Sequence, residues 1–581
     1  MGTISDKLMR IINTKEDIRQ ALISKGYDVP TSIPFKEYAK MILDLPCKVD
    51  SFPDIEGIVA RYSASGLTNE QMAANPVWVD KTGNGHDLQL KNFAWKGMSG
   101  VGGYVGDFSK WVNNRDTTEI GITKSNSKVI IDVKVSQGSG KNIVFISKSN
   151  LGISNNVTIK ITSTYPEGVM KFANSASNKY LKLPSNGIIT LQDNPEYTSN
   201  EMHLHLASAD LGQITIEQLP LYPGALVFDG VDDYGVCENF PILTKEKGYT
   251  VVALRQWITR GERALGLVSN VKNWLNNGAF LLEYRNIQAD HLNKPISFGA
   301  IGSEMDLPHI LTYQTSKSYN GVSITTGNFE GTDVLHVGKL APTNVGTCIN
   351  AAIWELVFLD HDATEEELTK IKDYFVKTYP WLFFDQAWTV VGKTNEDEDR
   401  ATIANITGNG NDLILSNFGF AEGSGYNEQG EYAGYLVTDG VDDKIVSSVF
   451  GMGKDFTIVG DWKFIDNKKS GTGLVKGSSF YIYNTMIGLD LYINSGSVKN
   501  SLDGIKSINA ACSDGRAYDR NWNEILANTG NVVGSGGTLE VSSSGGRFDR
   551  IAFKNLAIYP RILSKYDCVK AYNYLQTIKA K

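Results

Sequence analysis

The feature that most constrains this chain is an internal repeat. The segment TGNGHDLQLKNF at residues 82–93 recurs as TGNGNDLILSNF at residues 407–418, with nine of twelve positions identical. Two further blocks recur in the same order: residues 226–233 with 436–443, and residues 355–375 with 555–575. Three blocks repeated in one order predict two copies of a single fold along the chain.

The spacing of these blocks locates an insertion in the first copy. The first block pair is offset by 325 residues and the second by 210, so the first copy holds 115 additional residues between them. Stretches inside this segment, such as VIIDVKV at 129–135 and VTIKI at 157–161, alternate apolar with polar residues and are rich in β-branched side chains. Both features are typical of half-buried strands. We therefore predict a β-sandwich over residues 105–220, inserted into an exposed loop.

The composition agrees with strands joined by tight turns. The 581 residues include 57 glycines and only 16 prolines, which is more glycine and less proline than average. A net charge of −8 argues against a nucleic-acid partner, because such a partner requires a basic face. The five cysteines are widely spaced and the seven histidines show no metal-binding spacing, so the sequence predicts neither a disulfide framework nor a zinc site.

No stretch of the sequence predicts a membrane partner. Residues 1–10 lack the apolar segment of a signal peptide, and no apolar run approaches the roughly 18 residues that a spanning helix needs. We therefore expect synthesis in a cytoplasm, without insertion into a membrane.

The first 48 residues differ from the rest in their helical periodicity. Apolar residues recur three and four positions apart, and Gly26 suits a helix end. Three short helices cannot bury a core alone, so we expect this module to anchor the chain to other proteins or to copies of itself. The alternative is a helical cap on the following domain. The residues assigned to anchoring or oligomerisation are Ile4, Leu8, Ile11, Ile18, Phe35, Tyr38 and Ile42.

The repeated unit resembles the concanavalin-like and laminin-G-like lectin superfamily. The resemblance rests on T-G-N-G-x-D-L-x-L, then L-V-F/T-D-G-V-D-D, an apolar strand at 249–253 or 456–459, and a closing strand and helix. The second copy keeps the family's closing pattern at Tyr559, Arg561 and Leu563, whereas the first departs from it. The resemblance implies a mainly β chain: two jelly-roll sandwiches, besides the inserted β-sandwich and the short helical N-terminal module.

The predicted domains follow from these boundaries. They are a helical module at 1–48, a first laminin-G-like jelly roll split between 52–104 and 221–381, an inserted β-sandwich at 105–220, and a second laminin-G-like jelly roll at 382–581. Each repeat is expected to close on a helix, which begins at Thr364-x-x-Glu367 in the first copy and at Ser564-x-x-Asp567 in the second.

The repeated DGVDD segment allows two interpretations. Asp and Gly at these positions favour a tight turn between paired strands. Oxygen-rich sites in related lectins hold Ca²⁺, and the carboxylates of both copies are calcium candidates by that resemblance. They are Asp229, Asp232, Asp233, Asp439, Asp442 and Asp443. We favour the structural turn and expect no cofactor.

The N-terminal module resembles a segment near the start of tail-fibre and other structural proteins of tailed bacteriophages. The shared pattern is T-K-x-x-I-R-x-A-I/L-x-x-K-G-x-x-V-P followed by F-x-x-Y-A-x-x-I, and the matches run from Thr14 to Ile42. The resemblance implies a virion protein, a fibre-like appendage of tail or capsid that forms a dimer or trimer and contacts other virion proteins through its N-terminus. The chain shows no long coiled coil, which favours a head (capsid) fibre over a tail fibre.

The motifs favour binding over catalysis. No strand pattern places two carboxylates as a jelly-roll glycoside hydrolase requires, and no G-x-S-x-G or phosphate-binding loop occurs. Sugar sites combine aromatic platforms with polar groups on loops. The tryptophans in Gly-, Asn- or Asp-rich stretches are therefore the candidates for glycan binding: Trp78, Trp95, Trp111, Trp274, Trp388 and Trp522. Trp257, Trp354 and Trp462 alternate with apolar neighbours and are predicted core residues.

We expect a chain without enzymatic activity that displays lectin-like domains for attachment to host-surface glycans. Purely structural decoration of a capsid or tail, without a ligand, is the alternative. A capsule-degrading glycoside hydrolase is a further one.

Overall fold

The computed structural model describes Arg19 and residues 52–580, apart from a set of internal segments. The segments outside the description are 112–118, 136–140, 148–156, 167, 174–179, 192–200, 207–210, 245, 259–264, 271–280, 285–310, 320, 324–331, 340–347, 408–409, 466–472, 477–479, 485–487, 494–501, 504–507, 527–537, 542 and 545–546. The predicted anchoring residues Ile4, Leu8, Ile11, Ile18, Phe35, Tyr38 and Ile42 all lie outside the described residues.

The described chain is mainly β and consists of paired antiparallel sheets, as the sequence predicted. In the first jelly roll, one sheet runs β21 (Val322–Ser323), β20 (Ser318–Tyr319), β19 (Leu311–Thr315), β16 (Thr250–Trp257), β23 (Asn350–Leu359), β14 (Leu226–Asp229) and β4 (Gly100–Val101), with β1 (Ile58–Ser63) also on β23. The facing sheet runs β18 (Leu281–Tyr284), β17 (Leu265–Ser269), β22 (Leu335–Val337), β15 (Tyr234–Cys237), β3 (Leu88–Lys91) and β2 (Val77–Trp78).

The inserted segment forms a smaller sandwich. One sheet runs β10 (Tyr180–Lys182), β9 (Met170–Ala173), β12 (Glu201–Leu206) and β7 (Lys141–Ser147), and the other runs β11 (Asn186–Leu191), β8 (Val157–Ser163), β13 (Gly212–Gln218), β6 (Lys128–Val133) and β5 (Ile120–Lys124). Along β6, Val129, Ile131 and Val133 are buried in the core while the residues between them are partly exposed. The period-2 pattern of the sequence is therefore confirmed on this strand.

The second jelly roll repeats the arrangement of the first. One sheet runs β27 (Gly425–Asn427), β28 (Tyr435–Val437), β41 (Ile551–Tyr559), β30 (Thr457–Phe464), β35 (Ile508–Cys512), β36 (Arg516–Asp519) and β37 (Glu524–Leu526), with β24 (Gln386–Thr389) also on β41. The facing sheet runs β25 (Thr402–Ile403), β26 (Leu413–Ser416), β29 (Lys444–Ser447), β38 (Leu539–Val541), β31 (Gly473–Lys476), β32 (Phe480–Asn484), β33 (Gly488–Ile493) and β34 (Leu502–Asp503). A small ribbon, β39 (Ser543–Ser544) with β40 (Arg547–Phe548), lies beside it.

Helices follow the closing strands of both jelly rolls. Helix α4 (Glu365–Thr378) begins at Thr364, whose side chain forms the predicted capping box with Glu367. Helix α5 (Lys565–Leu575) begins at Ser564, whose side chain accepts from the backbone N–H of Asp567. Between residues 52 and 580, the described chain also contains the shorter helical segments α3 (Asn69–Ala74), η1 (Phe108–Lys110) and η3 (Pro380–Leu382). Within the described part of the chain, no helix is long and apolar enough to cross a membrane.

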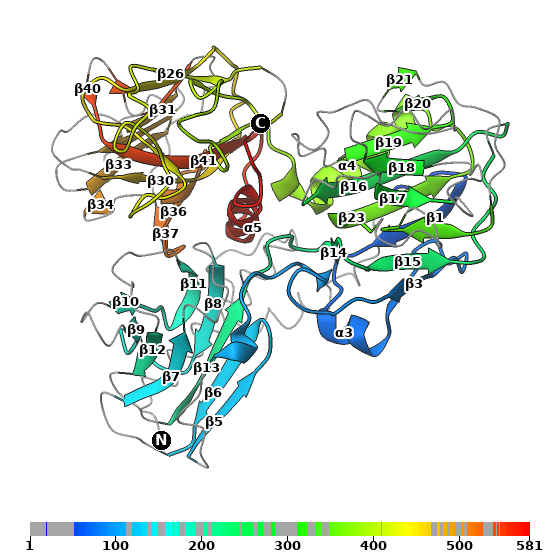
Figure 1. Ribbon diagram of the computed structural model, residues 1–581, viewed down its shortest axis with the longest axis horizontal. Coiled ribbons are helices and arrows are strands. Elements are labelled where there is room, and N and C mark those ends of the chain that lie inside the picture. Colours follow the sequence, from blue (N-terminus) through cyan, green and yellow to red (C-terminus); the bar gives the residue numbers. More distant parts are fainter. Residues whose placement is uncertain are drawn as a thin grey trace.

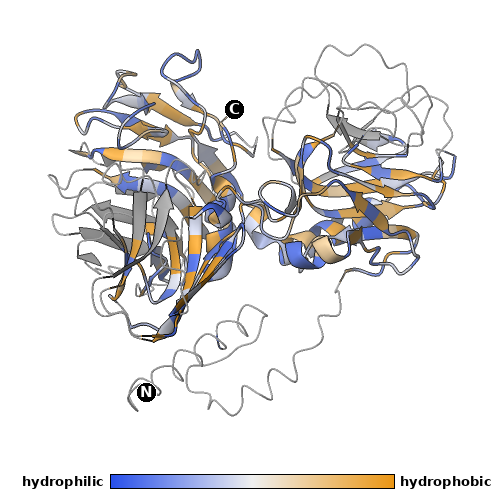
Figure 2. Cartoon of the chain, turned by 60° about the horizontal axis from the view of Figure 1, so that its bottom comes forward, coloured by the Kyte–Doolittle hydropathy of each residue, from blue (hydrophilic) through white to orange (hydrophobic). Residues whose placement is uncertain are grey.

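Strand β23 is buried on both of its faces. Ile353 and Phe358 point into the sandwich core of the first jelly roll, whereas Trp354 and Val357 belong to a second cluster on the outside of the same sheet. Figure 2 shows how hydrophobic and hydrophilic residues alternate along other strands, which have one face in water. The continuous apolar run of β23 therefore reflects a sheet covered on both sides.

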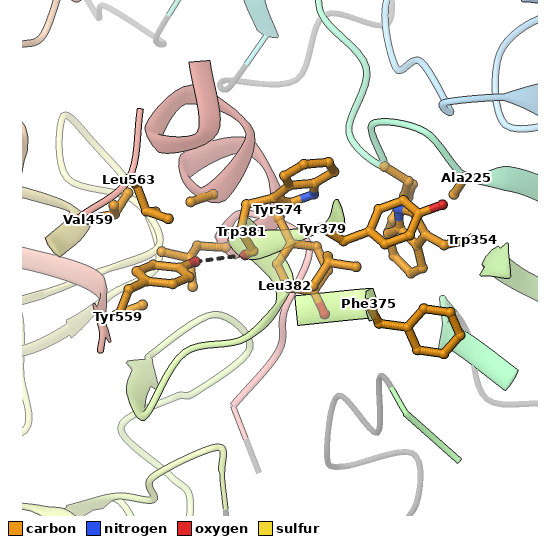
Figure 3. Close-up of a cluster of buried hydrophobic side chains, with 14 of the residues drawn as sticks. Ala225, Trp354, Phe375, Tyr379, Trp381, Leu382, Val459, Tyr559, Leu563 and Tyr574 are labelled. Atoms are coloured by element: carbon orange, nitrogen blue, oxygen red, sulfur yellow. Dashed lines mark hydrogen bonds between the residues drawn. The ribbon is translucent and has the colours of Figure 1, made fainter. Parts of the chain in front are cut away.

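The three lobes meet at one shared apolar cluster, which we call the junction core. Figure 1 shows α5 between the first jelly roll on the right, the inserted sandwich at lower left and the second jelly roll at upper left. The cluster joins the outer faces of the two jelly rolls through α4, η3 and α5, and includes Ile188 of the insertion. In Figure 3, the hydroxyl of Tyr559 donates to the carbonyl of Trp381 at 2.9 Å. The hydroxyl of Thr158 in the insertion donates to Asn573 Oδ1 in α5 at 2.7 Å.

Candidate functional site

Most of the predicted platform tryptophans are core residues, which corrects that prediction. Trp78, Trp111, Trp388 and Trp522 are all at most 1% exposed. A buried indole presents no face to a sugar, and these rings are part of the hydrophobic cores instead. Trp78 and Trp388 donate their Nε1–H groups to backbone carbonyls, each at 2.9 Å, and Trp522 packs edge-on against Tyr572 in the junction core.

The remaining tryptophans include confirmed core residues and one candidate that is partly exposed. Trp257, Trp354 and Trp462 are buried, so their prediction as core residues is confirmed. Trp274 lies outside the described residues. Trp95 is partly exposed and packs against the edge of the first sandwich core. Of the six candidates, Trp95 is the described one with a ring that reaches the surface.

Trp95 lies in a loop with unusual backbone geometry. Its φ is 53°, and that of Asn92 in the same loop is 67°. Such values are uncommon outside glycine and need support from neighbouring contacts. The support comes from Phe93, whose ring stacks on that of Trp95 at 4.8 Å and 17°, and from Ser99 Oγ, which accepts from the backbone N–H of Ala94 at 2.7 Å.

The second jelly roll has the same loop at residues 417–426. Asn417 and Phe420 carry φ values of 69° and 48°, and Ser424 Oγ accepts from the backbone N–H of Gly419 at 2.8 Å. Phe420 takes the place of Trp95 and is also partly exposed. The candidate residues proposed from the sequence omitted Phe420 because only tryptophans were considered. The 325-residue offset of the repeat was the signal that could have identified it.

The DGVDD segments form hydrogen-bonded turns beside these loops. In the first jelly roll, Asp233 Oδ2 accepts from the backbone N–H of Asp229 at 3.0 Å, and Asp229 Oδ1 accepts from that of Val231 at 2.8 Å. The equivalent distances in the second jelly roll are both 2.7 Å. The structure therefore has the turn that the sequence favoured, because each buried carboxylate satisfies backbone donors of its own turn.

The calcium alternative concerns the same side chains. In each turn, carboxylate oxygens of the three aspartates lie within 4.8 Å of one another. Both oxygens of Asp233 already accept hydrogen bonds, from Asp229 and from Ser99 Oγ at 3.0 Å. The hydrogen bonds account for the repeated sequence without an ion, and calcium binding by Asp229, Asp232, Asp233, Asp439, Asp442 and Asp443 stays a prediction.

Each loop and its turn form one unit, which we call a loop cluster. Loop cluster one comprises residues 92–101 and 229–233, and loop cluster two comprises residues 417–426 and 439–443. Asn92 Nδ2 donates to the carbonyl of Asp232, and Asn417 Nδ2 donates to that of Asp442, both at 3.0 Å. At the tips of the turns, Val231 and Val441 are 69% and 68% exposed.

Burial raises the pKa of the last aspartate of the turn in each loop cluster, Asp233 or Asp443. The pKa of Asp233 rises from 3.8 to about 7 and that of Asp443 to about 6, mainly through desolvation and against the hydrogen bonds that each carboxylate accepts. A raised folded-state pKa means that the folded chain binds the proton more tightly than the unfolded chain does. This contribution to stability is present at low pH and is lost as pH rises through the folded-state pKa.

We expect Asp233→Asn to flatten the pH dependence of stability. In the native chain, the melting temperature should fall between about pH 4 and pH 7 because Asp233 loses its proton while buried. The asparagine cannot ionise, so the variant should lose that part of the slope. Calorimetry at four pH values checks this, with exposed Asp232→Asn as control. An unchanged slope in Asp233→Asn would contradict the assigned cause.

Each loop cluster combines the groups that a sugar site uses. A partly exposed ring, Trp95 or Phe420, lies in a loop whose backbone is held by hydrogen bonds. An asparagine of the same loop is hydrogen-bonded to the turn that carries an exposed carboxylate, Asp232 or Asp442. Aromatic faces contact the apolar faces of sugar rings, and carboxylates accept hydrogen bonds from hydroxyl groups. A loop that is already ordered loses little entropy on binding.

Comparisons with known proteins place this chain in no family. No protein-family model matches it, and no curated protein matches it. Among solved structures, it is similar to a Trypanosoma rangeli sialidase in complex with sialic acid, at 10% identity over 80% of this chain and 86% of that one, with a TM-score of 0.25. It is also similar to the botulinum neurotoxin serotype D binding domain, at 10% identity over 60% of this chain and 89% of that one, with a TM-score of 0.21.

One prediction from the sequence is corrected by this comparison. The expectation that the chain has no enzymatic activity is withdrawn, because several of the matched structures are sialidases. At these identities and TM-scores the likeness assigns no reaction and no ligand to this chain.

Proposed function

We propose that this chain binds carbohydrate through its two loop clusters. The observation that carries the proposal is the repetition of one constellation in both jelly rolls. Each has a partly exposed ring at positive φ, an asparagine that ties the loop to the turn, and an exposed carboxylate. The ring stands at the same position of both loops, as Trp95 in one and Phe420 in the other, and it is partly exposed in each.

Two weak sites on one chain support multivalent attachment. Binding at the second site becomes intramolecular once the first is occupied, and a dimer or trimer would multiply the effect. The resemblance of the N-terminal module to phage structural proteins supports the further proposal of a virion appendage that meets host-surface glycans. A chain that only decorates the particle is the competing proposal, and it predicts no glycan binding at all.

We expect the double variant Trp95→Asn, Phe420→Asn to weaken glycan binding by roughly tenfold or more, since each ring's contact with a sugar is worth about 1 kcal/mol. Asparagine is chosen because it tolerates positive φ, so the loop keeps its backbone. The measurement is a glycan array with the immobilised chain, followed by titration of the best glycan. Melting temperatures of both proteins check that the fold is intact.

A matched pair of valines provides the control. Val441 in loop cluster two and Val449 outside it are both 68% exposed. Val441→Ser should weaken binding and Val449→Ser should not. No binding of the native chain on a dense array, or equal effects of the two valine variants, would overturn the proposal.

A further inference from the structure

Two buried thiols lie against each other where the second jelly roll meets helix α5. The described cysteines, Cys237, Cys348, Cys512 and Cys568, are all free and buried. Cys512 is the last residue of β35, and Cys568 lies near the start of α5. Both belong to the junction core and are 0% exposed. Their thiols are hydrogen-bonded to each other, and we call these two residues the thiol pair.

Hydrogen bonds hold the end of β35 against the segment that leads into α5. The thiol of Cys512 donates to the carbonyl of Leu563 at 3.8 Å, and the hydroxyl of Thr457 donates to Cys512 Sγ at 3.6 Å. Thr457 Oγ1 also accepts from the backbone N–H of Leu563 at 2.9 Å. Ser564 caps α5, and its carbonyl accepts from the N–H of Cys568 at 2.9 Å. The strand end and the start of the helix are therefore fixed side by side.

The two thiols of the pair differ in acidity. The hydrogen bond with Cys568 lowers the pKa of the Cys512 thiol, against the effect of burial. Thr457 and Arg516 lower this pKa further, while Asp514 opposes them. Burial raises the pKa of Cys568 well above its usual value. Because the thiolate is the reactive form of cysteine, Cys512 is the nucleophile of the pair and Cys568 is the thiol that reacts second.

A single turn separates Cys512 from the surface. The N–H of Gly515 donates to the carbonyl of Cys512 at 3.0 Å, which closes a turn directly after β35. Arg516 Nε donates to Asp514 Oδ2 at 2.7 Å, and the two side chains are 30% and 33% exposed. We expect local opening of this turn to admit a small reagent without unfolding of the sheet.

The first jelly roll makes the same contact between strand and helix without thiols. Thr315 on β19 takes the place of Cys512, since each pairs with the equivalent threonine of β16 or β30. Both of those threonines accept from a backbone N–H just before the helix, at 2.7 Å and 2.9 Å. Leu368 of α4 aligns with Cys568. This fold therefore does not need a thiol at either position.

We propose that Cys512 and Cys568 are a redox pair that a peroxide converts into a disulfide between β35 and α5. Cys512, as thiolate, attacks one oxygen of hydrogen peroxide, and the O–O bond breaks to give a sulfenic acid and hydroxide. The hydroxide takes up the proton that Cys512 released. The Cys568 thiol then attacks the sulfenic sulfur, the S–O bond breaks, and water leaves as the S–S bond forms. Two thiols and one hydrogen peroxide thus give one disulfide and two waters.

The disulfide would tie α5 covalently to the sheet of the second jelly roll and so restrain the junction core. A reductant of the dithiol class would reverse it by thiol–disulfide exchange. This site is independent of the loop clusters and of the function proposed for them.

The experiment treats the full, folded chain with hydrogen peroxide, then unfolds it in denaturant and counts its thiols. The chain has five cysteines, and we expect two thiols to be lost and to return after reduction with dithiothreitol. Peptide mapping by mass spectrometry should recover one linked pair of peptides that contains Cys512 and Cys568. Retention of all five thiols overturns the proposal, as does their loss without this linked pair.

Two variants and a control separate the thiol pair from the other cysteines. Cys568→Ala and Cys512→Thr should each abolish the reversible loss of two thiols, and threonine is the residue that the first jelly roll has at the position of Cys512. Cys348→Ala is the control, because it removes a buried free thiol of the first jelly roll and leaves the pair intact. Melting temperatures before oxidation check the fold of each variant. Equal loss of thiols in the native chain and in Cys568→Ala would contradict the assignment.

The melting temperature after oxidation supplies a second readout. A disulfide between residues 512 and 568 closes a long loop, so the oxidised chain should melt roughly 5 °C or more above the reduced chain. Cys348→Ala should show the same rise, whereas Cys568→Ala and Cys512→Thr should not. A linked peptide pair without any rise in melting temperature would overturn the proposed restraint of the junction core.

Discussion

Glu355→Ala should lower the free energy of unfolding by about 3–5 kcal/mol, because it leaves the charge of Arg61 buried without its partner. Arg61 Nε lies 3.1 Å from Glu355 Oε2, and the two side chains are only 4% and 0% exposed. The hydroxyl of Tyr379 donates to Glu355 Oε1 at 2.8 Å, and Arg61 Nη2 donates to the hydroxyl of Tyr374 at 2.9 Å. The network joins β1 and β23 to the helix that covers them.

The control for this prediction is an ion pair on the surface of α4. Lys370 Nζ lies 2.7 Å from Glu366 Oε1, with side chains 49% and 77% exposed. Glu366→Ala should change the free energy of unfolding by less than about 1 kcal/mol, because water screens the pair. Urea unfolding measures both variants. A loss below 1 kcal/mol in Glu355→Ala would show that the buried pair is dispensable.

The ion pair belongs to the first jelly roll alone. The aligned residue of the second is Asn555, whose Oδ1 accepts from the backbone N–H of Asp461 at 3.1 Å. The same buried position therefore holds a carboxylate paired with an arginine in the first jelly roll, and an amide that is hydrogen-bonded to the backbone in the second. Glu355→Asn alone should not substitute for the charge, since Arg61 would remain unpaired.

Trp354→Ala should cost about 3–5 kcal/mol and separate the unfolding of the lobes. Trp354 is fully buried in the junction core, donates Nε1–H to the carbonyl of Pro223 at 2.9 Å, and has the ring of Tyr574 of α5 at 6.1 Å. Its loss leaves a cavity where the second jelly roll packs on the first (Figure 3). Without this contact, the lobes share less buried apolar surface, so their unfolding should be less cooperative.

Differential scanning calorimetry tests this result. We expect Trp354→Ala to broaden or split the unfolding transition, whereas Trp257→Ala, in the sandwich core of the first jelly roll, should destabilise that lobe without opening the junction. Cleavage by protease near residues 379–386, which link the two jelly rolls, should accelerate only in Trp354→Ala. A single sharp transition and unchanged cleavage in that variant would contradict the role of the junction core.

Local features of this chain could be predicted because they depend on few neighbouring residues. The turn at Asp229–Asp233 and the helix starts at Thr364 and Ser564 are satisfied by hydrogen bonds within five residues. The β class followed from alternation along strands such as β6. Each of these patterns has its physical cause within the segment that shows it.

The sites could be predicted only in part, because the local sequence does not show how deeply a side chain is buried. Trp95 and Trp78 both lie in loops rich in glycine and asparagine, yet one ring reaches the surface and the other is buried. Whether a ring is covered depends on which strand passes over it. Phe420 was missed for another reason, because only tryptophans were considered although the repeat aligns it with Trp95.

The sequence by itself determined the repeat, the strand and turn character, and the place of the insertion. Only the tertiary structure decided that the lobes share a junction core, where Thr158 and Asn573 meet across 415 positions of the chain. It also decided that the outer face of the closing strand carries the buried Trp354 in the first jelly roll and the half-buried Lys554 in the second. The reason is physical: periodicity states which residues share a face, while burial and charge balance depend on what covers that face.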